Sequence, residues 1–347
     1  MQWIRANLFS SWLNSSITLL LGALLLLTVP HIWSWGMANA VWSANAEQCH
    51  IARGTGACWG VITEKYRTII FGRYPFEEQW RPLIATLLLM GLLIVSCIRQ
   101  FWRTGLAAAW VVGLSLFLLF MHGGLFGLSK VETGLWGGLP LTLLLSTLSL
   151  AACFPFAVLL ALGRMSDLPV IRSLCTVYVE LIRGVPLVSV LFMASFLFPL
   201  FMPEGFSIDV LVRVLVAMAL FAAAILSEVI RGGLQSIPRG QYEASAALGL
   251  SYWQMQRKII LPQALATVVP GIMNNFISTF KDTSLVTIVS LYELTGSLDI
   301  AVNSDPTWMP YKLEGYLFIA AIYFVFCFSL SRYSQWIERQ VNRGKVH

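Results

Sequence analysis

Long runs of hydrophobic residues, separated by short polar connections, dominate the chain. A helix that crosses a bilayer needs about 20 consecutive, mainly apolar residues. The runs that meet this requirement lie at 15–35, 82–98, 106–121, 139–162, 174–201, 210–230, 264–296 and 313–331. The pattern therefore predicts an all-α integral membrane protein with about eight transmembrane helices.

The seventh run is too long for one straight crossing, and it contains the polar tripeptide Lys281-Asp282-Thr283. Backbone groups that a break frees at membrane depth must bind protein or water. We therefore expect a helix break at residues 281–283 that faces a cavity or another helix.

Composition agrees with a polytopic membrane protein. Charged residues make up 12% of the 347 residues, whereas soluble domains contain about 25%. The net charge of +6 is explained by orientation in the membrane and does not require a nucleic-acid partner.

Lys and Arg residues are divided unequally between the two sets of alternating connections. One set holds Arg5, Arg99, Arg103, Arg164, Arg172, Arg231, Arg239, Arg257, Lys258, Arg332, Arg339, Arg343 and Lys345. The other set holds Arg53, Lys65, Arg67, Arg73, Arg81, Lys130 and Lys312, mostly in one long loop. Because short cytoplasmic loops carry the excess of positive charge, the first set and both termini are predicted to be cytoplasmic.

The N-terminal run has an alternative interpretation. Arg5, the apolar residues 17–29 and the tripeptide at 38–40 resemble a secretory signal with its cleavage site. However, Trp33 and Trp35 separate the run from that tripeptide and are typical of the interfacial end of a spanning helix. A spanning helix is the preferred interpretation.

Two cysteines lie in the long outer loop. Cys49 and Cys58 are nine positions apart with two glycines between them, and in an oxidising compartment such a pair forms a disulfide. The alternative is two free thiols in a mobile loop. The remaining cysteines lie in or beside apolar runs, and the four histidines are scattered, so no metal site is predicted.

Residues 243–264, EASAALGLSYWQMQRKIILPQA, form a polar segment on the predicted cytoplasmic side. Residues 243–250 favour a short helix with a small apolar patch, and Gly249 permits a sharp turn. A second short helix from Tyr252 to Ile260 is expected to end before Pro262. Two short helices that meet at a glycine outside the bilayer indicate an element that docks into a partner's groove.

This segment resembles the EAA loop of ABC importer permeases, in which Glu-Ala-Ala precedes a Gly and a downstream Leu-Pro. The matching positions are Glu243, Ala244, Ser245, Gly249, Ile259, Leu261 and Pro262, with Ser245 in place of the second Ala. Residues 178–187, 228–241 and 281–286 resemble the polar amino-acid (His/Glu/Gln/Arg/opine) branch of this family. The likeness runs from about residue 137 to 339 and is similar to the M-type permease subunit of general L-amino-acid transporters.

The resemblance implies a C-terminal five-helix type I ABC importer (MetI-like) core at residues 136–340. Its EAA loop, at 231–262, would form the cytoplasmic coupling helices. The N-terminal region, 1–135, would add three spans and a periplasmic loop at 36–80 that contacts a binding protein or caps the bundle. The implied location is the bacterial inner membrane.

The resemblance also implies ATP-driven import of L-amino acids with broad specificity. The implied partners are a homologous permease subunit in a heterodimer, two ATP-binding subunits, a periplasmic amino-acid-binding protein and membrane lipid. No GxxxxGK[ST] motif occurs in the chain, so ATP and Mg²⁺ are expected on the partner ATPase. No catalytic residue, cofactor or nucleic-acid partner is expected for this chain.

Polar residues inside the apolar runs are the candidate substrate ligands, because an intramembrane charge costs roughly 2.5–3.5 kcal/mol at the bilayer centre. Asp282 would bind the ammonium group of an amino acid. Thr283, Ser284 and freed backbone N–H groups would bind its carboxylate. Further candidates for the same cavity are Glu228, Asn274, Asn275 and Ser278.

Structural alternatives exist for these residues. Lys281 is a candidate counter-ion of Asp282, and the two asparagines and Ser278 are also suited to helix–helix hydrogen bonds. The spacing of Glu180 and Arg183 favours an ion pair on one helix. Glu228 and Arg231 have the same spacing, so both interpretations of Glu228 stay open.

Two other classes of protein fit the sequence less well. An integral membrane enzyme needs a catalytic constellation, and the chain contains no paired His, HExxH or GxSxG motif. A proton-coupled secondary transporter uses buried carboxylates. It does not need a coupling loop, and the inverted repeats typical of that class are not found.

Overall fold

The computed structural model describes residues 2–205 and 207–343, and within these ranges the chain is helical and contains no strand. Two compact units are formed. The first unit comprises the chain up to Tyr66 together with Ala301–Phe318, and the second comprises Arg67–Ile300 together with the chain from Ile319 onward. The expected domain boundary near residue 135 falls within the second unit, and Lys345, predicted to be cytoplasmic, lies outside the described residues.

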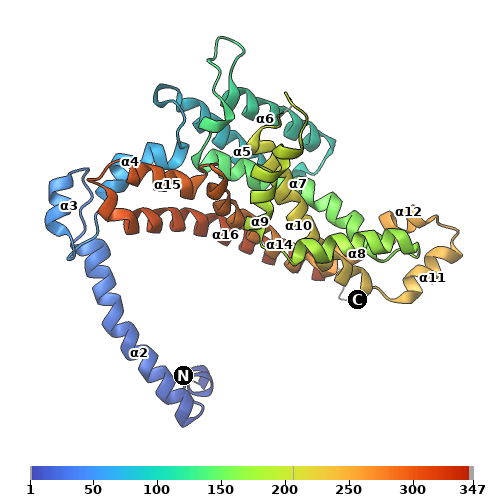
Figure 1. Cartoon of the computed structure of the whole chain (residues 1–347). Helices are drawn as coiled ribbons and strands as arrows, with labels where there is room; N and C mark the ends of the chain where they lie inside the picture. Colours follow the sequence, from blue (N-terminus) through green and yellow to red (C-terminus); the bar gives the residue numbers. More distant parts are fainter. Residues whose placement is uncertain (1, 206, 344–347) are drawn as a thin grey trace. The chain divides into compact units, whose positions relative to one another are not determined.

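The helices of the two units are shown in Figure 1. The first unit holds α1 Gln2–Asn7, α2 Trp12–Trp33 and α3 Ala46–Ala52, and the helices α4 Gly60–Phe71, α15 Leu294–Asn303 and α16 Lys312–Arg343 continue from one unit into the other. The second unit holds α5 Trp80–Cys97, α6 Thr104–His122, α7 Gly138–Arg164, α8 Pro169–Arg183, α9 Leu187–Phe192, α10 Val210–Gln235, α11 Arg239–Ala247, α12 Tyr252–Met255, α13 Leu261–Thr267 and α14 Val269–Asp282.

Within the described residues, six helices are long and apolar enough to cross a membrane, and there are up to eight spans if each of two bent pairs counts as one. The first bent pair corrects the sequence-based expectation of a simple fifth span. The fifth expected span consists of Pro169–Arg183 and Leu187–Phe201, which are bent by 104°. Pro186 explains the bend, because proline has no N–H for the helix and constrains the residue before it.

The seventh expected span is also bent, but not where the sequence suggested. Its segments Tyr252–Thr267 and Val269–Val289 meet at 69°, so the larger bend lies at Val268, just before Pro270. At Thr283 the backbone changes from α-helix to a 3₁₀-helix, Thr283–Val289, and continues without a break. The expected break at 281–283 is therefore a change of helix type.

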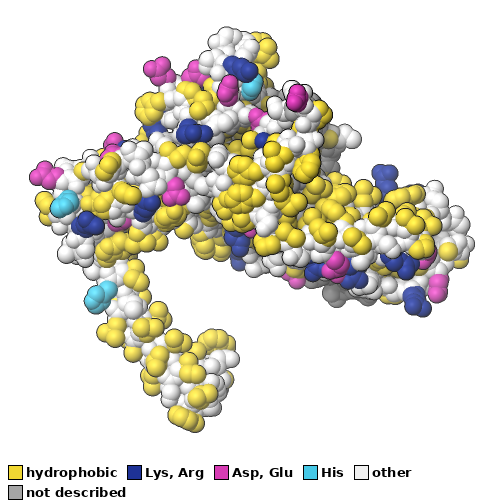
Figure 2. Space-filling model, in the orientation of Figure 1, with side chains coloured by type: hydrophobic (Ala, Val, Ile, Leu, Met, Phe, Trp, Pro, Cys, Tyr) yellow, Lys and Arg dark blue, Asp and Glu magenta, His cyan; other side chains and the backbone are white. Residues whose placement is uncertain are grey.

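The core of the second unit is built around α7 and α10, which pack along their length. Buried alanines on α10 let the two backbones approach closely, as small residues do in membrane helices. One apolar cluster includes Leu141–Leu145 of α7, and a second includes Cys153 to Leu162 of the same helix. Figure 2 shows hydrophobic side chains over the middle of this unit and Lys and Arg side chains towards the end that carries α11 and α12.

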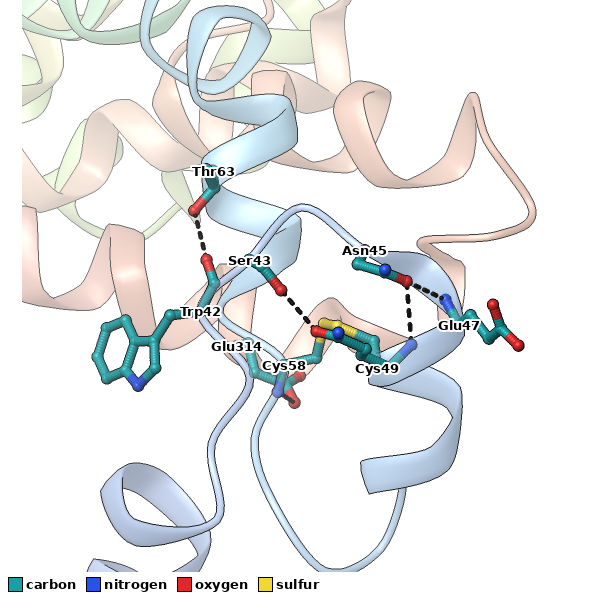
Figure 3. The surroundings of a disulfide bond; sticks show 9 residues. Trp42, Ser43, Asn45, Glu47, Cys49, Cys58, Thr63 and Glu314 are labelled. Atoms are coloured by element: carbon teal, nitrogen blue, oxygen red, sulfur yellow. Dashed lines mark hydrogen bonds between the residues drawn. A yellow bond between two sulfur atoms is a disulfide. The ribbon is translucent and has the colours of Figure 1, made fainter.

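The first unit contains a disulfide between Cys49, on α3, and Cys58, whose Cα atoms are 5.3 Å apart. The carboxylate of Glu314, near the start of α16, accepts a hydrogen bond from the backbone N–H of Cys58 at 3.0 Å. Asn45 caps α3 through the N–H groups of Glu47 and Gln48 (Figure 3). The loop that the sequence predicts to lie outside the membrane is thus tied to the start of the last spanning helix.

Helix α2 is apolar on all sides. In the apolar stretch that makes Trp12–Ala38 a candidate membrane span, no residue is buried. A helix that is hydrophobic all round suits a lipid environment. Its last helical turns include Trp33, followed by Trp35 in a short π-helix, Ser34–Ala38, which agrees with an interfacial end.

Candidate functional site

The first part of the candidate site is the connection between α10 and α14. Figure 1 shows α11 and α12 projecting from one end of the second unit. Between them, Gly249 has φ +71°, a left-handed conformation that glycine adopts without a steric penalty. Leu248, the residue directly after α11, donates its N–H to the carbonyl of Ala244. The sharp turn expected at Gly249 is present.

Two contacts hold the base of this connection against α10. The Cβ that a side chain at Gly233 would add lies 2.6 Å from the carbonyl oxygen of Ala264, so the backbones of α10 and α13 are in close approach there. The hydroxyl of Tyr242, on α11, donates to the carbonyl of Leu234 at 3.3 Å. Ser245 is 1% exposed and donates to the carbonyl of Gln241. The small residue expected at this position of the motif is therefore needed for packing.

The outer surface of the connection is apolar and exposed. Leu248 is 74% exposed, Trp253 63% and Tyr252 47%, and the two aromatic rings pack edge to face with their centroids 5.4 Å apart. Glu243 and Ala244 are also exposed. Exposed aromatic residues on short, fixed helices are typical of protein docking surfaces.

Pro262 does not end the second short helix, in contrast to the sequence-based expectation. After α12 the chain passes through a π-helix, Gln256–Ile260, and α13 then begins at Leu261 with Pro262 in its first turn. Proline is tolerated there because first-turn N–H groups have no acceptor within the helix. The motif positions Ile259, Leu261 and Pro262 thus lie on a continuous path from the connection into the membrane segment.

The second part of the candidate site is the polar side of α14. Asn274, Ser278 and Lys281 are exposed and lie at spacings of four and three residues, which places them on one face of the helix. Asn275 is 7% exposed, and its side-chain oxygen has no hydrogen-bond partner within the described residues. A polar face on a membrane helix requires protein or water as its neighbour.

Asp282, Thr283 and Ser284 follow this face. Asp282 is partly buried, whereas Thr283 is fully buried and donates to the carbonyl of Phe280 at 2.7 Å. Ser284 donates to the carbonyl of Lys281 at 2.8 Å. Both hydroxyls are therefore engaged with the backbone, and Asp282 contributes the charged group of this block.

Glu228, on α10, belongs to an ion-pair cluster that the sequence predicted only in part. Arg231 donates to both carboxylate oxygens of Glu228, and Arg183 Nη1 lies 3.8 Å from Glu180 Oε1. Arg164 joins the two pairs, with Nη1 2.6 Å from Glu228 Oε2 and Nη2 2.9 Å from Glu180 Oε1. From the sequence, Arg164 was expected only as a positive charge in a cytoplasmic loop.

A fully buried carboxylate, Glu293, was missed by the sequence-based predictions. It is fully buried, and it accepts hydrogen bonds from Tyr323 on α16, from Thr287 and from the N–H groups of Thr295 and Gly296. Glu293 lies within the apolar run 264–296. A search of that run for isolated charges would have found it.

These features define a class of protein. A bundle of membrane helices carries a fixed pair of short helices at one end and a polar face on one of its helices, as in the membrane-spanning subunit of a transporter.

Comparison with known proteins identifies the family. Residues 153–343 match the model of the binding-protein-dependent transport system inner membrane component. The whole chain is 46% identical to the inner membrane amino-acid ABC transporter permease protein YhdY of Escherichia coli (strain K12), over 94% of that protein. The chain belongs to this family of transport permeases, as the resemblance of its motifs implied.

Two further proteins are similar to this chain. The chain is 36% identical to the glutamate/glutamine/aspartate/asparagine transport system permease protein BztC of Rhodobacter capsulatus, over 99% of this chain and 94% of that protein. A crystal structure of an amino acid ABC transporter with histidines is 30% identical over 57% of this chain and 90% of the other, with a TM-score of 0.49.

Proposed function

We propose that this chain is one half of the membrane-spanning pair of an ATP-driven importer for L-amino acids. Its partners would be a homologous permease subunit, which forms a heterodimer with it, two ATP-binding subunits and a periplasmic amino-acid-binding protein. Both termini would be cytoplasmic, as the distribution of Lys and Arg indicates. The relatives, which are amino-acid transport permeases, support amino acids as the substrate class, and broad specificity is part of the proposal.

The observation that carries this proposal is the exposed apolar surface on the α11–α12 connection. Leu248, Tyr252 and Trp253 offer anchors for a groove on another protein. The connection is fastened to α10 by the close approach at Gly233 and by Tyr242. A rigid element fixed to spanning segments can transmit a rotation of its partner to the bundle.

The polar face of α14 supports the proposal that the substrate path runs along this helix. Asn274, Ser278 and Lys281 are exposed in this single chain, yet polar groups are costly in lipid. Contact of this face with the homologous subunit and with a water-filled path between the two chains would remove that cost. Asp282 would then bind the substrate ammonium at the end of the same helix.

Energy dependence tests the proposed function. Uptake of radiolabelled L-amino acids is measured in cells whose uptake depends on this chain, after ATP depletion with arsenate or after collapse of the proton gradient with an uncoupler. We expect arsenate to abolish uptake and the uncoupler to leave most of it. The opposite result, with uptake lost only when the proton gradient collapses, would assign the chain to proton-coupled transport.

Docking is tested by replacing Leu248 and Trp253 with alanine together. We expect loss of the ATP-binding subunits from the purified complex and normal insertion of the chain. Ile51→Ala is the control, because Ile51 is 76% exposed in the first unit and far along the chain from the connection. Retention of the ATP-binding subunits by the double variant would refute the docking role.

A further inference from the structure

One arginine supplies all the ion pairs that join different helices in the cluster around Glu228. Arg164 is the last residue of α7, and its side chain is 10% exposed. Its two terminal nitrogens bind carboxylates of two other helices, Glu180 on α8 and Glu228 on α10. The planar guanidinium can make both contacts at once because its donors are fixed in a fork.

The other ion pairs of the cluster stay within single helices. Glu180 and Arg183 are three residues apart on α8, and Glu228 and Arg231 are three apart on α10. If Arg164 were removed, each carboxylate would therefore keep a cation from its own helix. The loss would affect the link between helices, and neither acidic side chain would be left without an ionic partner.

The residues that Arg164 binds lie next to the docking connection and next to the 104° bend. Glu228 and Arg231 are on the final turns of α10, which leads through Pro238 into α11. Glu180 and Arg183 are on the final turn of α8, directly before the 104° bend. Arg164 thus connects the helix that carries the docking element to the helix that ends at the bend.

We propose that Arg164 is a positioning residue that transmits movement of the α11–α12 connection from α10 to α8. This inference rests on the proposed function, in which a partner moves that connection. Apolar packing between α8 and α10 lets the helices slide and re-pack, whereas a mostly buried arginine that binds one carboxylate on each of these helices fixes their relative position in a specific geometry. Coupling between distant parts of a protein is carried by such contiguous contacts.

The test compares amino-acid uptake with ATP hydrolysis, so that a loss of coupling is distinguished from a loss of either activity. The complete transporter is reconstituted in proteoliposomes, and both amino-acid uptake and ATP hydrolysis are measured in the presence of the binding protein. For Arg164→Gln we expect ATP hydrolysis within about twofold of the unmodified transporter and uptake per ATP reduced by at least about tenfold. For Arg164→Lys we expect an intermediate ratio, because a compact ammonium replaces the planar fork.

Arg172→Gln is the matched control. Arg172 lies near the start of α8, eight residues after Arg164, but its side chain is 53% exposed. Its ion-pair partner, Asp167, is fully exposed and lies 4.0 Å away. We expect no change in the ratio of uptake to hydrolysis for this variant.

Three results would overturn the inference. An unchanged ratio of uptake to hydrolysis in Arg164→Gln would leave Arg164 with at most a structural role. A fall of uptake and hydrolysis in parallel, in proportion to the amount of folded protein, would have the same meaning. If Arg164→Gln does not accumulate, an unchanged ratio in Arg164→Lys has the same meaning. Absence of ATP-driven uptake in the unmodified transporter would instead refute the proposed function.

Discussion

The phenol of Tyr323 donates a hydrogen bond of 2.8 Å to the carboxylate of Glu293, and this contact joins α16 to the residue before α15. The same carboxylate caps α15 by accepting from the backbone N–H groups of Thr295 and Gly296. Because the carboxylate is fully buried, each of these donors replaces water that the group would otherwise bind.

Tyr323→Phe is expected to destabilise the protein. The change keeps the aromatic ring and removes one donor from a buried acceptor, and a hydrogen bond to a charged group contributes about 1.5–3 kcal/mol. The apparent melting temperature in detergent should fall by several degrees. Tyr66→Phe is the control because Tyr66 is 50% exposed, and equal melting temperatures for both variants would contradict the role of the contact.

Gly249→Val should uncouple the transporter while the chain still inserts into the membrane. The space around a Cβ at Gly249 is open, so the effect arises from φ +71°. This left-handed conformation costs roughly 1–2 kcal/mol for an L-residue, and more for a β-branched one. Substrate-stimulated ATPase activity of the assembled transporter measures the result. Gly240→Val, at an exposed glycine with open space and no positive φ, is the control, and normal uptake by Gly249→Val would contradict the expectation.

The disulfide of the first unit should be found by mass spectrometry of unreduced peptides, with Cys49 and Cys58 linked. Replacement of both residues by serine should lower the unfolding free energy of this unit by about 2–4 kcal/mol, because the cross-link restricts the unfolded chain. Loss of the rigid loop should also weaken the hydrogen bond from Cys58 N–H to Glu314. Protease resistance of the loop measures this loosening, and complete alkylation of both thiols without reductant would exclude the bond.

Asp282→Asn should weaken the interaction with substrate. The variant keeps the size of the side chain and removes its charge, and a charge-assisted hydrogen bond contributes about 1.5–3 kcal/mol. The apparent affinity for substrate should therefore fall by roughly ten- to a hundredfold, while assembly and basal ATPase activity persist. Concentration-dependent uptake is the measurement. Asp167→Asn is the control, since Asp167 is fully exposed outside the spans.

Other outcomes for Asp282→Asn separate the alternatives. If Asp282 is the structural partner of Lys281, the variant should accumulate in lower yield. Unaltered yield together with unaltered uptake would exclude both the substrate role and the structural role.

The sequence by itself determined the membrane helices that have no bend and the turn between α11 and α12. A spanning helix depends on local composition, and its backbone hydrogen bonds join residues only four apart. The turn at Gly249 is local as well, because it depends on the conformational freedom of one residue. The positions of these elements could therefore be inferred without knowledge of any distant contact.

The tertiary structure decided which charged residues meet. Arg164 binds carboxylates 16 and 64 positions away in the chain, and Glu293 meets Tyr323, 30 positions away. Such pairs depend on how α7, α8, α10 and α16 pack, and the apolar composition that specifies each helix contains little information about its neighbours or its rotation. The bend at Val268 also appears only in the structure. In the sequence, both Pro270 and the polar tripeptide at 281–283 are places where this long apolar segment could change direction.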